Sequence, residues 1–334
     1  MKSEVSEVRN LLAVLANKIA KCEDVMNDQA VGNALYGLND MSCESWEVRK
    51  VLSALSQQIK KCTHPLSAQA VGNALYGLQR MNSRTKEVQD LLRVLTPQIN
   101  RCVEPLRAQN VANALYGLQS MSSDCKYVRR LLTVLNKLIA RSCTENFGAQ
   151  HVGMAMYGLQ SMTSDSREVR NLLITLSWKI SRCTESLRAQ NVGNALYGLQ
   201  NMNSDVAEVR HLLREVTTLI STCQEPLDAQ NIGNALYGLQ NIRDDSKEVS
   251  DLLRALTKQI ECSSEPLDAQ GIGNALYGLQ SMSSDSHEMR NLLSALKKRV
   301  AGCISPLNAQ GVGNALYGLQ NMNSDTKEVQ VSDP

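Results

Sequence analysis

Hydrophobic residues recur along the chain in two alternating patterns, and both have the period of an α-helix. The longer pattern places apolar residues at i, i+3, i+4, i+7 and i+11, on one side of a helix. In the first copy this pattern is formed by Val8, Leu11, Leu12, Leu15 and Ile19. A shorter pattern with almost no charge follows each longer one. In the second copy its apolar side is formed by Val71, Ala74, Leu75 and Leu78. The chain is therefore predicted to alternate long amphipathic helices with short, nearly uncharged ones.

The two patterns belong to one repeat of 40 residues. The hexapeptide NALYGL begins at Asn33, Asn73, Asn113, Asn194, Asn234, Asn274 and Asn314. A divergent copy, MAMYGL, begins at Met154, and every interval is 40 residues except the 41 between Asn113 and Met154. We therefore expect a single array, with copies at approximately 4–43, 44–83, 84–123, 124–164, 165–204, 205–244, 245–284 and 285–324 and a partial ninth at 325–334.

A repeat of this length indicates stacked helices. One helix pair cannot bury both of its apolar stripes alone, whereas stacking successive pairs buries them continuously. The expected fold class is all-α, an α-solenoid (superhelix) of eight helix-turn-helix repeats plus a partial ninth. The long helices are expected to begin at Asp-x-x-Glu capping boxes with the Asp as N-cap. These boxes are Asp165/Glu168, Asp205/Glu208, Asp245/Glu248, Asp285/Glu288 and Asp325/Glu328.

The composition excludes several classes of function. The formal charge of +2 excludes a strongly basic clamp, and the 20% of charged residues with 43% hydrophobic ones argues against long disorder. No apolar run reaches the roughly 20 residues that span a bilayer, so no membrane partner is expected. The first residues, MKSEVSEVRN, resemble neither a signal nor a transit peptide. Neither end carries an obvious polar cap, so the chain is expected to be part of a longer array.

The residues that usually perform catalysis or bind metals are not grouped. Each copy has one cysteine near the end of its long helix, with no CxxC pair, and the four histidines occupy unrelated positions. Successive helix layers lie roughly 8–10 Å apart, too far for a column of disulfides. We expect small buried thiols in a reducing intracellular compartment, and no enzyme activity, metal site, cofactor or small-molecule substrate.

The short helix also has a narrow uncharged side with one glutamine, one asparagine and one tyrosine per copy, such as Gln69, Asn73 and Tyr76. These side chains can bond between layers and pack, or they can face a ligand. Amides present a donor and an acceptor together, which suits the reading of base edges, and tyrosines can stack on bases. On the second interpretation the asparagine column supplies candidate base readers at Asn33, Asn73, Asn113, Asn194, Asn234, Asn274 and Asn314.

Two positions on this side vary between copies. The first runs Ala30, Ala70, Asn110, His151, Asn191, Asn231, Gly271 and Gly311. The second runs Asp40, Arg80, Ser120, Ser161, Asn201, Asn241, Ser281 and Asn321. A constant frame with changing polar residues is what a modular reader needs, but drift at solvent-facing positions after duplication gives the same pattern. On the reader interpretation the first position adds the candidate base readers Asn110, His151, Asn191 and Asn231.

An arginine recurs in the first turn of the long helix, where its charge opposes the helix dipole. The column comprises Arg9, Arg49, Arg129, Arg170, Arg210 and Arg290. These residues can form surface ion pairs, or they can contact phosphates at one charge per layer, which makes them candidate RNA phosphate contacts.

The short helix, read from Gln109 to Met121, resembles the signature helix of octotricopeptide repeats, which runs roughly Q-x-L-A-N-x-L-W-A-L-A-x-L. Gln109, Ala112, Asn113, Leu115 and Leu118 match it, and Tyr116 stands where that family has Trp. The period of 40 differs from the nominal 38 of the family. The resemblance implies a helix-pair solenoid that binds organellar RNA and acts in a chloroplast or mitochondrion.

The sequence thus predicts sequence-selective binding of single-stranded RNA by a modular solenoid, in post-transcriptional control of organellar transcripts. The alternative is a HEAT-like scaffold that binds a peptide or partner subunit on a concave face, since HEAT repeats are also near 40 residues long.

Overall fold

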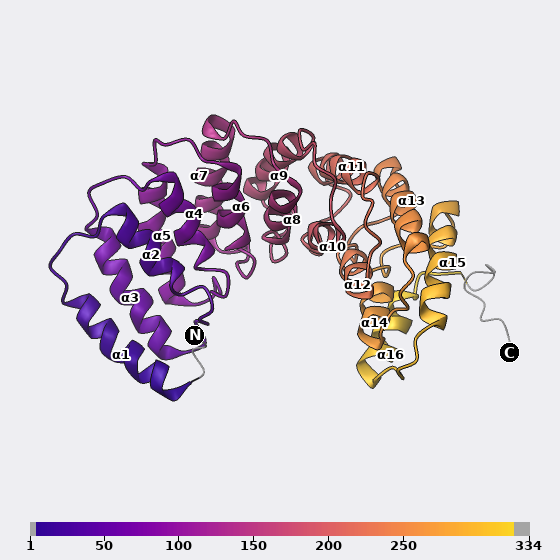
Figure 1. Cartoon of the computed structure of the whole chain (residues 1–334), viewed down its shortest axis with the longest axis horizontal. Coiled ribbons are helices and arrows are strands. Elements are labelled where there is room, and N and C mark those ends of the chain that lie inside the picture. The colour runs from indigo at the N-terminus through magenta and orange to yellow at the C-terminus, as the bar shows by residue number, and fades with distance from the viewer. Residues whose placement is uncertain (1–4, 324–334) are drawn as a thin grey trace. The chain divides into compact units, whose positions relative to one another are not determined.

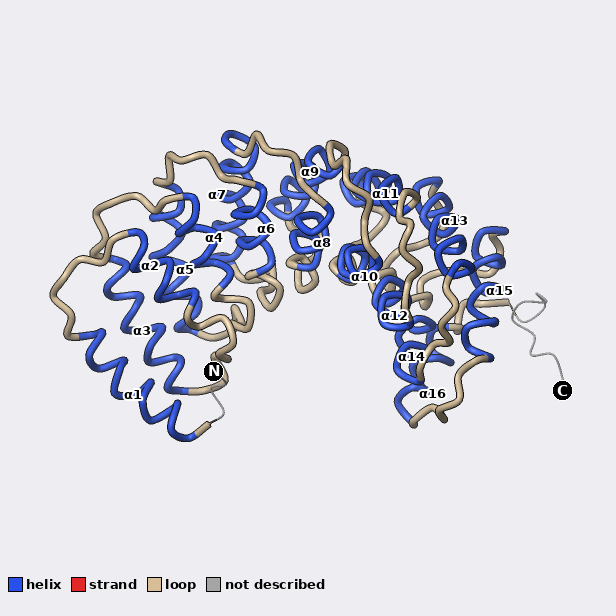
Figure 2. Tube along the Cα trace, viewed as in Figure 1, coloured by secondary structure: helices blue, strands red, loops and turns tan. Residues whose placement is uncertain are grey.

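The computed structural model describes residues 5–323, and over that range it contains helices and loops only (Figures 1 and 2). The long helices are α1 (Ser6–Ala20), α3 (Trp46–Lys60), α5 (Lys86–Asn100), α7 (Lys126–Ser142), α9 (Arg167–Ile180), α11 (Ala207–Ile220), α13 (Lys247–Cys262) and α15 (His287–Ala301). The short helices are α2 (Asp28–Tyr36), α4 (Ala68–Tyr76), α6 (Ala108–Tyr116), α8 (Ala149–Tyr157), α10 (Ala189–Tyr197), α12 (Ala229–Tyr237), α14 (Ala269–Tyr277) and α16 (Ala309–Gly318). The predicted start of a ninth copy, 325–334, lies outside the described residues.

The described residues form two compact units. Unit 1 comprises residues 5–146 and 161–175, and unit 2 comprises 147–160 and 176–323. The division falls within the fourth copy and α9, and the fourth copy is the one of 41 residues. None of the helices in residues 5–323 has both the length and the apolar character needed to cross a bilayer.

Within each unit the helices form two layers. Long helices pack on long helices, α1 on α3 and α3 on α5 in unit 1, and α11 on α13 and α13 on α15 in unit 2. Short helices pack on short helices, α2 on α4 and α4 on α6 in unit 1, and α8 through α16 in succession in unit 2. Figure 1 shows this most plainly for α11, α13 and α15 beside α10, α12 and α14. The all-α repeat solenoid is thus confirmed.

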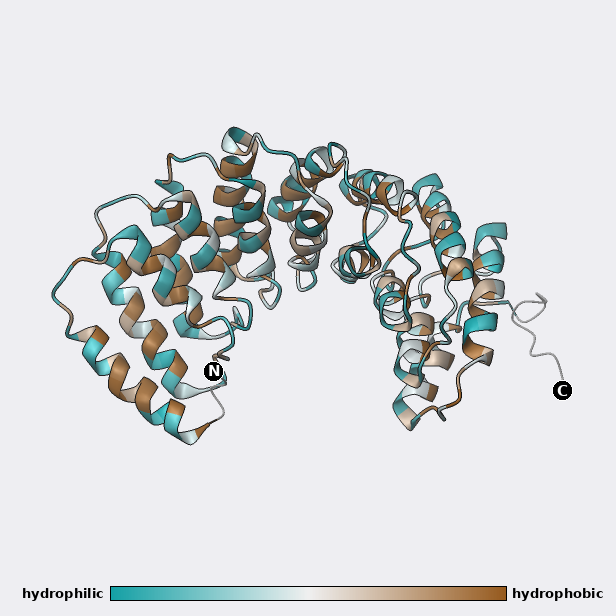
Figure 3. Cartoon of the chain, viewed as in Figure 1, coloured by the Kyte–Doolittle hydropathy of each residue, from teal (hydrophilic) through white to brown (hydrophobic). Residues whose placement is uncertain are grey.

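The predicted apolar stripes form the core between the layers. Val71, Ala74, Leu75 and Leu78 are completely buried, and Figure 3 shows apolar residues (brown) alternating with polar ones (teal) along the helices. Each buried leucine or valine contributes about 1.5–3 kcal/mol relative to an exposed one. The methionines that follow most short helices, such as Met81 and Met121, are also fully buried. The core therefore accounts for the most regular part of the sequence.

The long helices begin one residue later than the predicted capping boxes require. The N-cap of α13 is Ser246 and that of α15 is Ser286, whose hydroxyl accepts a bond from the N–H of Met289 at 3.1 Å. Asp165, Asp205, Asp245 and Asp285 each lie two residues before the first helical residue, so the Asp-x-x-Glu assignment is wrong in these four copies, and the fifth box, Asp325/Glu328, lies outside the described residues. The glutamate is instead the second helical residue, and its own backbone N–H and Arg254 hold the pKa of Glu288 below its usual value. A negative charge in the first turn suits the helix dipole.

The stacking of short helices depends on a glycine at the end of each. Gly77, Gly117, Gly198, Gly238 and Gly278 have ordinary helical φ angles, but a Cβ on any of them would lie 1.9 Å from a carbonyl oxygen of the preceding short helix. Gly117, for example, faces the carbonyl of Leu75. The glycine is therefore required for close approach between layers, not for turn geometry.

We predict that Gly117→Ala destabilises the fold by about 1–3 kcal/mol, because the added methyl group has no room. Gly37 has the same helical conformation but faces no preceding repeat, and its nearest neighbours would be carbonyls of its own helix at 3.5–3.6 Å. Gly37→Ala should be neutral or stabilising by up to about 1 kcal/mol. Chemical unfolding followed by circular dichroism measures both, and equal losses in the two variants would contradict the explanation.

Candidate functional site

The exposed side of the short helices carries a strip of neutral side chains, here called the amide strip, which consists of the glutamine and asparagine columns. The eight glutamines at the second helical position are exposed. They are Gln29, Gln69, Gln109, Gln150, Gln190, Gln230, Gln270 and Gln310. Asn33 is exposed, and the other six asparagines of the column and Met154 are half-buried. The glutamines are therefore the most accessible amides, although the sequence singled out the asparagines.

Ala70, which was expected on this side, is buried instead. It lies with Gly77 at the contact between neighbouring short helices. The helical geometry of one copy places them outward, but packing of the adjacent copies covers them. The exposed strip is therefore narrower than the sequence predicts. It contains a glutamine in every short helix, paired with an asparagine in all of them except α8, where Met154 takes that place. In α6 this pair is ordered by a bond of 2.7 Å from Nε2 of Gln109 to Oδ1 of Asn113.

The third helical residue, the first variable position, caps its own helix in three consecutive copies. Oδ1 of Asn110 accepts a bond from the N–H of Arg107 at 2.9 Å, and Asn191 does the same for Arg188 at 3.1 Å. In α8, Nδ1 of His151 accepts from the N–H of Gly148 at 3.0 Å. A backbone N–H can only donate, so the remaining polar atoms of these three side chains are N–H donors.

In the other five copies the capping runs the opposite way. The side chain of the N-cap residue accepts from the N–H of the third helical residue, at 2.6–3.3 Å. These pairs are Asn27/Ala30, Ser67/Ala70, Asp228/Asn231, Asp268/Gly271 and Asn308/Gly311. The N-cap and third residues therefore vary together, because one of the two must satisfy the helix end. Of the predicted readers in this position, Asn231 is buried, with 8% of its surface exposed.

Shallow hollows lie between neighbouring short helices along the strip. The hollow between α2 and α4 has a volume of about 370 Å³, that between α8 and α10 about 380 Å³, and that between α12 and α14 about 280 Å³. Glutamines of both helices line each hollow, and the N-cap and third residues of the second helix complete it. Each hollow thus combines a constant amide lining with a variable pair.

The N-termini of four short helices are occupied by carboxylates of the chain itself. The first N–H of α4 donates to Glu104, and those of α6, α8 and α10 donate to Glu145, Glu185 and Glu225, all at 2.8–2.9 Å. A helix N-terminus is otherwise a ready anion site. In these four copies the acidic side chain of the following repeat fills it, so a phosphate would meet a carboxylate there.

The tyrosines of the short helices stack on one another within each unit. In unit 1 Tyr76 lies between Tyr36 and Tyr116, and in unit 2 the series runs from Tyr157 to Tyr317, with ring centroids 5.5–5.8 Å apart and planes within 18–24°. Burial, with a smaller effect of the adjacent phenols, raises the pKa of Tyr197. The packing interpretation of the tyrosine column is therefore confirmed, and ring faces inside the series are covered.

The residue at the second variable position joins its own copy to the previous copy. Its side chain donates to a backbone carbonyl about 40 residues earlier, for example Ser120 to Gln79 at 2.7 Å and Asn201 to Gln160 at 2.6 Å. The same bond is made by Arg80, Ser161, Asn241, Ser281 and Asn321. All of these residues carry a donor, which explains their restricted variation without a ligand.

The arginine column lies in the layer of long helices, and most of its side chains donate hydrogen bonds to backbone carbonyls of nearby loops. Nη1 of Arg129 donates to the carbonyls of Ser123 and Asp124 at 2.8 Å, and Arg49, Arg170 and Arg290 bind the equivalent pair. Arg210 binds the carbonyl of Ser204 at 2.7 Å, and Arg9 is exposed at the first copy. These bonds fasten the loop before α3, α7, α9, α11 and α15, and they explain an arginine where the helix dipole disfavours one.

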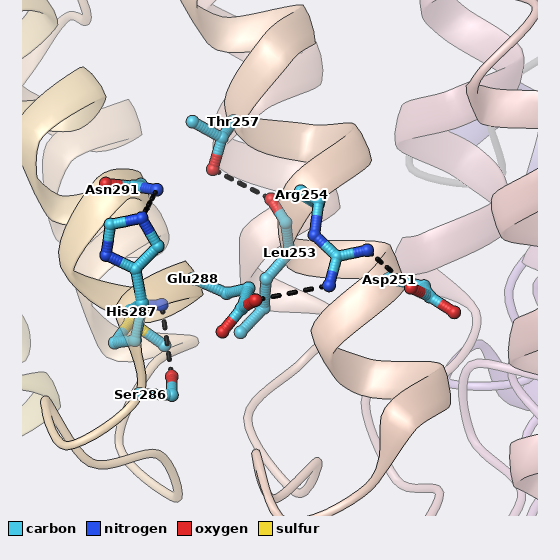
Figure 4. A network of polar contacts seen from close by, with 9 residues as sticks. Asp251, Leu253, Arg254, Thr257, Ser286, His287, Glu288 and Asn291 are labelled. Atoms are coloured by element: carbon cyan, nitrogen blue, oxygen red, sulfur yellow. Dashed lines mark hydrogen bonds and ion pairs between the residues drawn. The ribbon is translucent and has the colours of Figure 1, made fainter.

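Charged residues gather on the long helices. Figure 4 shows Arg254 between Asp251, at 2.6 Å, and Glu288, at 3.1 Å, and Arg214 makes a similar bridge of 2.8 Å to Glu248. Arg214 lowers the pKa of Glu248 through this hydrogen bond. Such exposed pairs contribute about 0–1 kcal/mol each. Among the described residues no cluster of three or more histidine, cysteine or acidic side chains is arranged to hold a metal.

The cysteines follow the packing prediction in most copies. Cys62, Cys102, Cys143, Cys183 and Cys223 are buried, whereas Cys22 and Cys303 are only half-buried and Cys262 is exposed, so the prediction of burial is wrong in these three copies; none of the ten cysteines forms a disulfide. Burial raises the pKa of Cys62, Cys102, Cys183 and Cys223, which keeps these thiols protonated.

No known protein family and no curated protein matches this sequence. Among solved structures, the chain is similar to the pentatricopeptide repeat protein PPR10 in complex with an 18-nucleotide psaJ RNA element, with 14% identity and a TM-score of 0.35. A cysteine-to-serine variant of the same complex gives 13% identity and the same TM-score. In both cases the match covers 94% of this chain but 44% of the other, so the chain spans less than half the length of these structures.

The coupled capping predicts a compensating pair of substitutions. Asn110→Ala leaves the N–H of Arg107 without its partner and should cost about 0.5–2 kcal/mol. Adding Arg107→Ser recreates the Ser67/Ala70 pair of the second copy and should recover most of that loss. A double-mutant cycle from urea unfolding measures the coupling, and additive losses would show that the two positions are independent.

Proposed function

We propose that this chain binds single-stranded RNA along the amide strip, with one base in each hollow between neighbouring short helices. The observation that carries the proposal is the lining of the hollows, in which constant amides are combined with an N-cap and third residue that change from copy to copy. Amides offer both hydrogen-bond roles to a base edge, and the variable pair supplies the selectivity. Helical-repeat proteins that read RNA use one repeat per base in this way.

The base preference follows from the fixed donors. In the third, fourth and fifth copies Asn110, His151 and Asn191 use their acceptor atom on the helix end, so the remaining polar atoms of each are N–H donors. Three consecutive copies should therefore favour bases with acceptors on the exposed edge, such as O6 and N7 of guanine. The acidic N-caps Asp228 and Asp268 in later copies favour bases with an amino group.

Phosphate contacts are assigned to arginines beside the strip. Arg188 lines the hollow between α8 and α10, and Arg107 holds the equivalent N-cap position of α6; both side chains are exposed. Of the six arginines predicted from the sequence, Arg49, Arg129, Arg170, Arg210 and Arg290 bind loop carbonyls beside the long helices, so we rank this column below Arg107 and Arg188 as phosphate contacts.

The spacing of the copies sets the conformation of the RNA. Stacked nucleotides advance about 3.4 Å along a strand, whereas the tyrosines that mark successive short helices are 5.5–5.8 Å apart. One base per repeat therefore requires bases that are separated from one another, as they are in single strands bound by repeat proteins. We further propose that this activity serves the control of organellar transcripts, a proposal that rests on the resemblance to octotricopeptide repeats alone.

We predict that His151→Asn strengthens the preference for guanine at one nucleotide and leaves the others unchanged, because the single N–H donor of the imidazole is replaced by the two of an amide. Asparagine already caps the neighbouring helices α6 and α10, so the helix end stays satisfied. The loss of the edge contact with Phe147, whose centroid is 6.2 Å away, should cost no more than about 1.5 kcal/mol of stability. Selection from randomised single-stranded RNA before and after the change gives the preference.

The matched control is His211→Asn, which makes the same chemical change at an exposed position of α11 in the other layer. It should leave the selected sequence unchanged. If neither protein retains any RNA at low salt, the proposal fails and a protein partner becomes the remaining explanation for the strip.

The near-neutral strip predicts a weak dependence of RNA affinity on salt. Each phosphate contact to a single strand adds about 0.7 to the slope of log K against log salt, so two arginines give a slope of about 1–2. Arg107→Gln and Arg188→Gln should each reduce the slope by about 0.7 without changing base preference. Arg93→Gln, on the exposed surface of α5 beside Asp90, is the control and should have no effect. A loss of several orders of magnitude between low and physiological salt would mean that charge, not the amide strip, drives binding.

A further inference from the structure

The long helix α7 differs from the other long helices in its charge. It carries Lys126, Arg129, Arg130, Lys137 and Arg141 and no acidic residue. Each of the other long helices has a glutamate in its first turn. The positive charge of α7 alone exceeds the formal charge of +2 of the whole chain, so acidic residues balance the cations elsewhere but not on this helix.

Four of these cations form one line on the surface of α7. Lys126, Arg130, Lys137 and Arg141 are exposed, and at about 100° per residue they lie within about 80° around the helix axis. A rise of about 1.5 Å per residue spreads them over about 22 Å. We call these four residues the basic ridge. Arg129 is not part of it, because that side chain binds the loop before α7.

The basic ridge is not neutralised by the chain itself. None of its four residues makes an ion pair with an acidic side chain of residues 5–323. Nη2 of Arg141 donates to the carbonyl of Cys102 at 3.1 Å, which positions the side chain but leaves its charge unpaired. On the following helix α9, the carboxylate of Glu168 accepts a hydrogen bond from Ser166 at 2.9 Å. The ridge therefore presents its positive charge to solvent.

A substitution in α7 removes the carboxylate that other copies supply beside this ridge. Tyr127 stands where the other long helices have glutamate. In α13 that glutamate, Glu248, binds Arg214 of the preceding long helix at 2.8 Å. The equivalent arginine before α7 is Arg93, on α5, which packs on α7. Within the described residues the acidic partner of Arg93 is Asp90 of its own helix, at 3.3 Å. The contact between α5 and α7 thus lacks one carboxylate.

We propose that the basic ridge docks an acidic segment of a protein partner, with one of its carboxylates at Arg93 in place of the missing glutamate. Acidic residues one turn apart on a partner helix lie about 6 Å apart along its axis. Lys126 and Arg130 have the same spacing, and so do Lys137 and Arg141. The proposal is independent of RNA binding along the amide strip, because the strip belongs to the short helices.

The surroundings of the ridge favour carboxylates over a nucleic acid or a membrane. Single-stranded RNA gains affinity by stacking its bases on aromatic rings. Tyr127 is half-buried, and Nζ of Lys126 and Cζ of Arg130 already lie 5.1 and 5.9 Å from its ring centroid, so the ring is not an open platform for a base. The other exposed residues of α7 are Thr133 and Ala140, which are too small to anchor the helix in a bilayer.

Fluorescence anisotropy with a fluorescein-labelled oligoglutamate peptide tests the proposal. The wild-type chain should bind the peptide at low salt and release it as salt rises. Lys126→Gln/Lys137→Gln should raise the dissociation constant about three- to tenfold, because two exposed ion pairs are lost. The matched control is Lys247→Gln/Lys258→Gln, which removes two exposed lysines at the equivalent positions of α13. It changes the net charge equally and should leave the affinity unchanged.

Tyr127→Glu gives α7 the glutamate of the other long helices and should also weaken peptide binding about three- to tenfold, because the new carboxylate occupies Arg93. Circular dichroism checks that the variants are folded. No peptide binding at low salt, or equal losses in the α7 and α13 double variants, would overturn the proposal. Retention of single-stranded RNA should be the same in wild type and Lys126→Gln/Lys137→Gln. A loss of RNA as large as the loss of peptide would make the ridge a general polyanion site and would also overturn it.

Discussion

The contact between backbone and backbone at the end of each short helix sets the geometry on which the other contacts depend. Because glycine lets one short helix approach the carbonyl of the previous one, the short helices pack closely within each unit. The distance between copies is then set by atoms of the main chain, which are the same in every copy. The tyrosine spacing of 5.5–5.8 Å varies little for this reason.

Because this distance is fixed, polar side chains form the same hydrogen bonds between neighbouring copies repeatedly. Serine and asparagine of the second variable position reach the carbonyl of the previous copy, and Gln119, Gln240 and Gln280 bond to the glutamine one copy earlier. Because these hydrogen bonds join neighbouring copies, they hold successive copies in register in addition to the packing of leucines.

Much of the fold could be predicted from the sequence, because helical periodicity and a 40-residue repeat both follow from local order. The buried stripe of Val71, Leu75 and Leu78 was identified correctly on these grounds. The function of the individual polar positions could not be predicted, because it depends on the neighbouring copy. Arg129 and Ser120 looked free to meet a ligand, but their partners are carbonyls in a loop and in the preceding layer. The exposed glutamines were visible as a column, yet their accessibility follows from packing that one helix alone does not show.

The coupling between the N-cap and third residues limits what a reader built on this fold can present. In a copy whose third helical residue accepts from the N-cap N–H, as Asn110 does, the N-cap side chain is not needed for capping and can be arginine or glycine. The third residue then presents an N–H donor at the hollow. A copy that uses an acidic N-cap, as with Asp268, frees the third residue to be glycine and leaves a carboxylate at the rim of the hollow. Stability and selectivity are therefore linked at the same two positions. Since either arrangement satisfies the helix end, copies can differ in hydrogen-bonding character at little cost in folding free energy, which is the property that a modular reader requires.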